Sequence, residues 1–292
     1  MDFSCQRPDI TPAFMVFTME DFKDCIDVST FNKDHGTDFD NYELKVISQQ
    51  DFRDVSLSLN GVERGYWPLP CRITLLPDYS RPNNIRVIPC VRFFYNTKTT
   101  TRYHFLEPVE EFFDLEKEGE YRFPNLKFKY RESVSFPVLE TFIQDTRFSS
   151  IDTIHGATLE ISQIEEEGVV KPVGKVVLGA FPYFNIATDY FTLAAGGTQQ
   201  FWEIYYKCDG EMTTYLDFNN ATYPSQNMVV LLPTKGEWKK AYIDISQAVS
   251  DAAGYATEVS VRLGIRGNKV ANSTQAYFYL GNIKLITMRA PY

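Results

Sequence analysis

The chain has 292 residues, of which 44% are hydrophobic and 15% aromatic, so it can bury a core in each of two domains and is too apolar for wholesale disorder. Its formal net charge is -9 and its Lys and Arg residues are scattered, which argues against a nucleic-acid-binding surface. No run of about 18 apolar residues occurs, so we expect no membrane-spanning helix.

The N-terminal residues 1–12 contain a segment that resembles an anchoring signal. Ser4-Cys5 followed by the polar run 6–9 resembles the end of a bacterial lipoprotein signal peptide, in which that cysteine is acylated. The resemblance implies that Cys5 is lipidated and that residues 1–12 form a lipid-anchor tether, which would hold the protein at a membrane without spanning it.

The remaining cysteines give no sign of a metal site. The chain contains no CxxC pair and no histidine at ligand spacing from a cysteine, so we expect neither a metal nor a cofactor. Cys71 and Cys90 either form a disulfide or are small buried hydrophobic residues, and the sequence leaves both possibilities open.

Residues 13–136 predict a first β-domain. Residues 13–19 are apolar enough for an opening strand, residues 32–37 suggest a turn, and the alternation in residues 42–48 predicts a half-buried strand. Residues 55–59 alternate as well, and Asn60-Gly61 then favours a two-residue hairpin turn into residues 62–67. With further strands at 86–95, 102–106 and 126–131, we expect an antiparallel immunoglobulin-like sandwich of about seven strands.

Residues 137–292 predict a second β-sandwich. Its expected strands are short and alternate in hydrophobicity, and one short helix is expected at 246–253. The strands are expected at residues 157–162, 174–178, 200–208, 215–218, 241–245, 259–265 and 276–286.

The alternation within these strands divides their side chains between the core and solvent. It places Trp202 in the core, whereas Trp238 falls at a turn. Outward-facing aromatic and charged side chains typically line a glycan-binding groove or a protein interface. The expected ligand-binding residues are therefore Tyr205, Tyr215, Asp217, Tyr242, Asp244 and Arg262.

Several segments together resemble a family of poorly characterised outer-membrane lipoproteins of Bacteroidota. In the first domain these are the segments Tyr66-Trp67-Pro68-Leu69-Pro70, 85–89 and 92–95, although Cys90 stands where the relatives tend to have glycine. In the second, residues 236–246 and 279–283 resemble the last strands of jelly-roll carbohydrate-binding modules, with Gly281-Asn282 in place of the usual Asp-Asn. The resemblance implies a C-terminal jelly roll and a cell-surface location on the outer membrane, and the missing carboxylate at Gly281 weakens any inference about a structural calcium ion.

Catalytic motifs of the common hydrolases and nucleotide-binding enzymes do not occur, and the three histidines are isolated in the sequence. A jelly-roll glycosidase is the enzymatic alternative, but the strand around Asp244 lacks flanking glutamates, and the other outward pair, Glu203 with Asp217, is better read as exposed strand carboxylates. We therefore expect a non-catalytic subunit of an outer-membrane protein assembly, with a glycan-binding module of a polysaccharide-capture system as the alternative.

Overall fold

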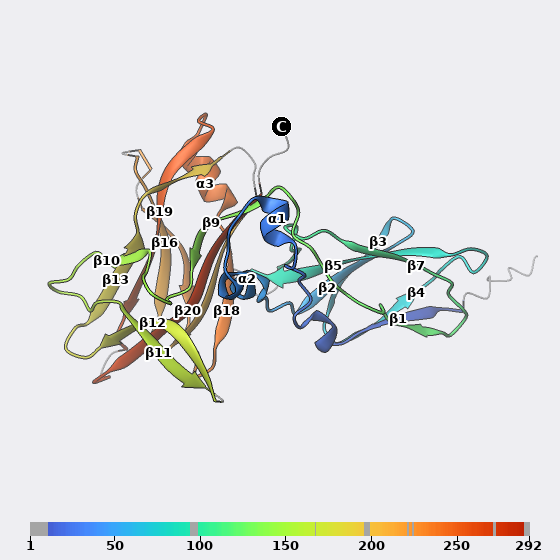
Figure 1. Cartoon of the computed structure of the whole chain (residues 1–292), viewed down its shortest axis with the longest axis horizontal. Helices are drawn as coiled ribbons and strands as arrows, with labels where there is room; N and C mark the ends of the chain where they lie inside the picture. Colours follow the sequence, from blue (N-terminus) through green and yellow to red (C-terminus); the bar gives the residue numbers. More distant parts are fainter. Residues whose placement is uncertain are drawn as a thin grey trace, which may run out of the picture. The chain divides into compact units, whose positions relative to one another are not determined.

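The structure is a computed structural model and describes residues 11–93, 99–166, 168–195, 199–220, 222–223, 225–270 and 273–288 (Figure 1). It is 52% strand and 9% helix, which confirms the predicted all-β class. Within the described residues, no helix combines the length and apolar character needed to cross a membrane. Cys5 lies outside these residues, and its acylation stays a prediction.

The chain forms two compact units. Among the described residues, the first unit comprises 11–30, 48–92 and 100–131, and the second comprises 31–47, 93, 99 and the residues from 132 onward. The division after residue 131 lies close to the expected boundary at 137. However, the expected contiguous first domain 13–136 does not hold, because residues 31–47 belong to the second unit.

The first unit contains two β-sheets. A three-stranded sheet has the order β4-β1-β8, with β8 parallel to β1, and a five-stranded sheet has the order β3-β2-β5-β6, with β7 also pairing with β5. The elements are β1 (Ala13–Phe17), η1 (Glu20–Phe22), β2 (Asp54–Leu59), β3 (Val62–Pro68), β4 (Cys71–Leu75), β5 (Asn83–Arg92), β6 (Thr100–Arg102), β7 (Val109–Phe113) and β8 (Glu120–Tyr121).

The predicted hairpin between β2 and β3 is confirmed. Asn60 and Gly61 have φ values of 52° and 78°, the left-handed conformation that a type I′ turn requires at both central positions. The core of this unit is rich in phenylalanine: the ring of Phe17 contacts those of Phe22 and Phe123. The strand expected at 126–131 is absent as a named element and is reduced to isolated bridges at Phe128 and Tyr130.

The second unit is an antiparallel sandwich of two sheets. The first, which we call the β19 sheet, has the order β10-β13-β19-β16-β17 with β14 on β19, and the second, the β20 sheet, has the order β11-β12-β20-β15-β18 with β9 on β20. The elements are α1 (Phe31–His35), α2 (Asn41–Ser48), β9 (Val134–Glu140), β10 (Phe148–Ser150), β11 (Glu160–Glu166), β12 (Val169–Leu178), β13 (Tyr183–Thr188), β14 (Phe191–Ala194), β15 (Gln200–Cys208), β16 (Met212–Phe218), β17 (Gln226–Leu231), β18 (Lys239–Asp244), α3 (Ser246–Ala253), β19 (Glu258–Asn268) and β20 (Ala276–Met288).

The inward faces of these two sheets enclose one apolar core. Phe184 of the β19 sheet and Phe278 of the β20 sheet meet edge to face at 5.0 Å, and both are buried. Trp202 is fully buried in the same core, as its parity predicts. Because both sheets turn one face inward, their other faces point away from each other on opposite sides of the sandwich.

The prediction of a strand at 42–48 is wrong, because α2 occupies this segment. Asp40 Oδ1 accepts hydrogen bonds from the backbone N–H groups of Tyr42 and Glu43, and Glu43 Oε2 accepts one from the N–H of Asp40 at 2.9 Å. This reciprocal arrangement is a capping box, which starts a helix and overrides the local alternation. The turn expected at 32–37 likewise contains α1.

Cys71 and Cys90 do not form a disulfide, and both are free thiols. Cys90 is buried, and burial raises the pKa of its thiol far above the usual range. Burial also raises the pKa of Cys71 to about 11. Both side chains therefore stay protonated at neutral pH and behave as small apolar groups.

Candidate functional site

The six ligand-binding residues predicted from the sequence do not form one site. Tyr205, Tyr242 and Asp244 lie on the β20 sheet, in β15 and β18. The other three, Tyr215, Asp217 and Arg262, lie on the β19 sheet. The two groups therefore occupy opposite faces of the sandwich, and each face has to be considered by itself.

On the β19 sheet, Asp217 and Arg262 are cross-strand neighbours and form an ion pair at 2.6 Å. Asp217 also accepts a hydrogen bond from the hydroxyl of Tyr190 at 3.0 Å, and the Arg262 guanidinium lies 4.9 Å from the centre of the Tyr190 ring. The charges of Asp217 and Arg262 therefore satisfy each other, which suits a polar network that holds β16 and β19 in register.

Tyr215 faces outward on the same sheet, but its ring lies on the sheet surface and is only 5% exposed. It packs over Gly264, where a Cβ atom would lie 2.0 Å from the ring, and its hydroxyl donates to Asn185 at 2.8 Å. The expectation that Tyr215 is exposed is wrong, because the missing side chain of Gly264 lets the ring lie flat.

Tyr242 and Asp244 of the β20 sheet also differ from expectation. Tyr242 faces outward by register but is only 3% exposed. Asp244 is exposed and accepts hydrogen bonds from the backbone N–H and the hydroxyl of Ser246, at 2.9 and 2.5 Å. Since Ser246 is the first residue of α3, Asp244 has a structural role at the start of that helix.

A buried charge cluster lies beside Tyr242 on this face. Glu203 contacts the Nζ atoms of Lys240 and Lys284 at 3.0 and 3.1 Å, and Lys284 is fully buried. Lys284 Nζ also donates to the backbone carbonyls of Val46 and Ile47 at 3.3 and 3.2 Å. The carbonyl groups at the end of α2 thus lie on the outward side of the β20 sheet, which explains why Glu203 is buried rather than exposed.

Another part of the same face carries a contiguous set of aromatic rings, which we call the aromatic strip: Tyr205, Trp238, Tyr277 and Tyr279. All four are partly exposed. The rings of Tyr205 and Trp238 are stacked, with centroids 4.7 Å apart and planes inclined by 16°. Tyr277 and Tyr279 have ring planes only 5° apart, with centroids separated by 6.2 Å.

Lys207 connects the two halves of the strip. Its Nζ lies 5.9 Å from the Trp238 ring and 5.7 Å from the Tyr279 ring. Glu166 accepts a hydrogen bond from Lys207 at 2.8 Å and one from the indole N–H of Trp238 at 2.6 Å. Burial of Glu166 raises its pKa, but these hydrogen bonds and the nearby lysines outweigh it, so the pKa is lowered and the carboxylate stays ionised.

Two backbone features produce the strip. Lys235 and Gly236, with φ values of 55° and 85°, form a tight turn that leads directly into Trp238. Opposite Tyr205 and Tyr206, the register of β20 shifts at Gly281 in a β-bulge. A Cβ atom on Gly281 would lie 2.7 Å from the Tyr205 ring and 3.1 Å from the indole of Trp238, so the bulge gives both rings the space to lie against the sheet.

Sequence reasoning found only Tyr205 of this strip. Tyr277 and Tyr279 alternate with the buried Phe278 and Leu280, so parity alone could have identified them. The bulge at Gly281 then reverses the parity and turns Lys284 to the outward face. Trp238 carries no comparable signal, because its place depends on a turn and on a neighbouring strand that is distant in sequence.

No protein-family model and no curated protein matches the chain. Among solved structures, the chain is similar to one that concerns the promiscuous specificity of carbohydrate-binding modules from the β-sandwich superfamily. The identity is 13% and the TM-score 0.35, and the match covers 80% of this chain and 85% of that one. It is also similar to a family 29 carbohydrate-binding module in complex with cellohexaose, at 9% identity and a TM-score of 0.30, covering 52% and 92%. A third is the K2 adhesin domain of Lys-gingipain, at 13% identity and a TM-score of 0.35, covering 53% and 98%. Likenesses this distant carry no argument about ligands.

Proposed function

We propose that the second unit is a non-catalytic glycan-binding module and that the aromatic strip is its binding face. The observation that carries the proposal is the contiguity of the four partly exposed rings of Tyr205, Trp238, Tyr279 and Tyr277 with one lysine between them. Planar aromatic rings cover the apolar faces of sugar rings, while neighbouring charged groups bind the hydroxyls around their edges. Lys207 and Glu166 are placed to do this.

The charged groups around the strip favour binding over hydrolysis. A glycosidase needs one carboxyl group with a raised pKa to act as the acid. Glu166 has a lowered pKa, Glu203 is buried against two lysines, and Asp244 is engaged at the start of α3. None of these three carboxylates is in the environment that an acid requires.

The strip also bears on the alternative of a protein-assembly subunit, which was the first expectation from the sequence. Three of the four rings of the strip lie close to a charged group: Trp238 and Tyr279 lie near Lys207, and Lys175 lies 5.9 Å from the Tyr277 ring. A mixture of rings and charged groups fits a ligand with both hydroxyls and apolar faces better than it fits the apolar core of an obligate protein interface. We therefore place glycan binding ahead of the assembly role.

The test is a glycan array followed by titration with the polysaccharide that binds best. Trp238→Ala should weaken affinity at least about fivefold, since a lost stacking partner costs on the order of 1 kcal/mol beyond simple burial. Tyr279→Ala should have a similar effect. Tyr255→Ala is the matched control, because this tyrosine follows α3 and is fully exposed away from the strip.

Three results would contradict the proposal. If Tyr190→Ala, which removes the ring beside Arg262 of the β19 sheet, abolished binding while Trp238→Ala did not, the opposite face would be the site. If the array showed no binding and a detergent extract yielded a stoichiometric membrane protein partner, the assembly role would replace glycan binding. Release of reducing sugar by the protein would identify an enzyme.

A further inference from the structure

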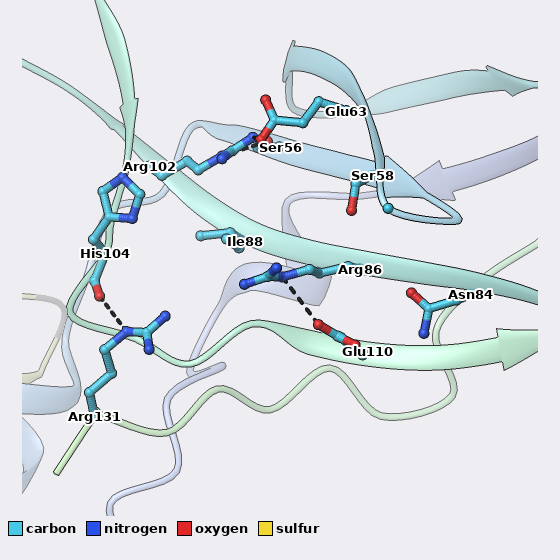
Figure 2. A pocket seen from close by; sticks show the side chains of 11 residues that line it. Ser56, Ser58, Glu63, Asn84, Arg86, Ile88, Arg102, His104, Glu110 and Arg131 are labelled. Carbon is cyan, nitrogen blue, oxygen red and sulfur yellow. Dashed lines mark hydrogen bonds and ion pairs between the residues drawn. The ribbon is translucent and has the colours of Figure 1, made fainter.

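The first unit contains a polar pocket on the face of its five-stranded sheet (Figure 2). Its volume is about 260 Å³, below the common range of drug-sized ligand sites and suited to a single small ligand. Ile88 provides an apolar surface among otherwise mostly polar side chains. The lining residues are Ser56, Ser58, Gly61, Glu63, Asn84, Arg86, Ile88, Arg102, His104, Glu110 and Arg131.

Three arginines, Arg86, Arg102 and Arg131, give this pocket its chemistry, and they come from β5, β6 and the end of the first unit. Against two glutamates, they leave an excess of positive charge in a chain whose net charge is -9. Burial and the charges of Arg102 and Arg131 lower the pKa of His104, with Glu63 opposing them, so its imidazole is neutral at pH 7.

The existing contacts of two of these arginines leave room for an anionic ligand. Arg86 contacts Glu110 through Nε at 3.2 Å, and both side chains are nearly half exposed, so the pair contributes little stability. Arg102 donates from Nε to Ser56 at 3.1 Å and pairs through one terminal nitrogen with Glu63. A guanidinium has five N–H donors, so each of the two keeps donors for a carboxylate beyond these contacts.

An aromatic ring lies beside two of the lining residues, Ser56 and Arg102. Tyr66 lies opposite Ser56 in the register of β2 and β3, and its ring centre is 5.8 Å from the Arg102 guanidinium. The ring is 47% exposed. An exposed ring beside a guanidinium suits a ligand that combines an apolar ring face with a carboxylate, and the Ser and Asn side chains can bind hydroxyl groups.

We propose that this pocket binds one acidic sugar residue, a hexuronate, whose carboxylate is held by Arg86 and Arg102 and whose ring packs against Tyr66. This site lies in the first unit and does not depend on the aromatic strip. It would add selectivity for acidic glycans to the protein.

Calorimetric titration of the full chain with sodium galacturonate and sodium glucuronate tests the proposal, with galactose and sulfate as the neutral and inorganic probes. We expect binding of at least one hexuronate, no comparable binding of galactose and weaker binding of sulfate. Arg86→Gln should weaken hexuronate binding about tenfold, as expected for a lost hydrogen bond to a charged group. Glu110→Gln should strengthen it, because the competing carboxylate is removed.

Matched variants separate the parts of the proposal. Arg64→Gln is the control, since Arg64 is exposed on β3 but does not line the pocket. Tyr66→Ala should weaken hexuronate binding and leave sulfate binding unchanged, and Trp238→Ala should leave both unchanged. The proposal is overturned if no hexuronate binds, if galactose or sulfate binds equally well, or if Arg86→Gln has no more effect than Arg64→Gln.

Discussion

Lys284 is the one charged residue in the sequence 276–286, and the structure buries it completely between Glu203 and the carbonyl groups of Val46 and Ile47. A buried ion pair seldom adds stability over apolar residues of similar size, because desolvation offsets the Coulomb attraction. Its contribution is directional: the Nζ atom fixes where the end of α2 meets the β20 sheet. The pair therefore positions α2 on the sheet more than it stabilises the fold.

The environment of Lys284 predicts a pH dependence. Burial lowers its pKa to about 7, an effect that Lys240 adds to and Glu203 opposes, while an unfolded lysine titrates near 10.5. Between these two values the unfolded chain binds more protons than the folded chain, so the free energy of unfolding rises with pH from about 7 to about 10.

Urea unfolding at pH 7 and at pH 9.5 measures this effect. We expect Lys284→Met to remove about 3 kcal/mol of the rise in unfolding free energy between these pH values. Lys239→Met, at an exposed lysine of β18, should retain the rise. If the free energy of unfolding changed equally with pH in the parent chain and in Lys284→Met, burial would not shift the titration of Lys284 and the prediction would be wrong.

At the scale of elements, α2 shows how a few hydrogen bonds decide between a strand and a helix. Tyr42, Leu44 and Val46 alternate with polar residues, as in a half-buried strand. The capping box of Asp40 and Glu43 satisfies backbone N–H groups that only a helix leaves open at its start. Two local signals compete here, and the one that satisfies the backbone prevails.

The stability of α2 should therefore depend on Asp40. Replacing an N-cap aspartate by alanine removes the acceptor for two N–H groups and costs about 1 kcal/mol. Asp40→Ala should accordingly lower the thermal midpoint, measured by circular dichroism, by a few degrees. Asp38→Ala is the matched control from the same exposed loop, and an equal loss in both variants would contradict the capping role.

Much of the fold and part of the candidate site could be predicted from the sequence. Asn60-Gly61 is a local signal with one favoured turn, and strict alternation placed Trp202 in the core. Features that depend on distant partners could not be predicted: the cover of Glu203 by α2, the flat packing of Tyr215 on Gly264, and the stacking of Trp238 on Tyr205. In each case, a side chain with the expected direction meets a neighbour that the local pattern does not encode.

At the scale of the whole molecule, the two units are interleaved along the chain. Residues 31–47 belong to the second unit although the first unit surrounds them in sequence. Phe31 of α1 contacts Phe136 of β9 with ring centroids 5.8 Å apart, and α2 supplies the carbonyl groups for Lys284. Part of the N-terminal half of the chain therefore packs with the second sandwich, although all the strands of that sandwich come later in the sequence.

This interleaving predicts that a cut at the apparent boundary leaves the second unit incomplete. A fragment of residues 132–292 lacks the Phe31 ring that packs on Phe136 and the carbonyl acceptors of the buried Lys284. The lost apolar contact and the unsatisfied charge should together lower the free energy of unfolding by about 2–4 kcal/mol. The unfolding midpoint of this fragment in urea should lie well below that of the same residues in the full chain. Hydrogen exchange in β15 and β20 measures both midpoints.

Joining residues 31–48 ahead of residue 132 through a flexible linker should restore most of the difference, whereas a scrambled 31–48 sequence on the same linker should not. If residues 132–292 alone unfold at the midpoint of the full chain, α1 and α2 contribute no stability to the sandwich, and the burial of Lys284 must be explained without them.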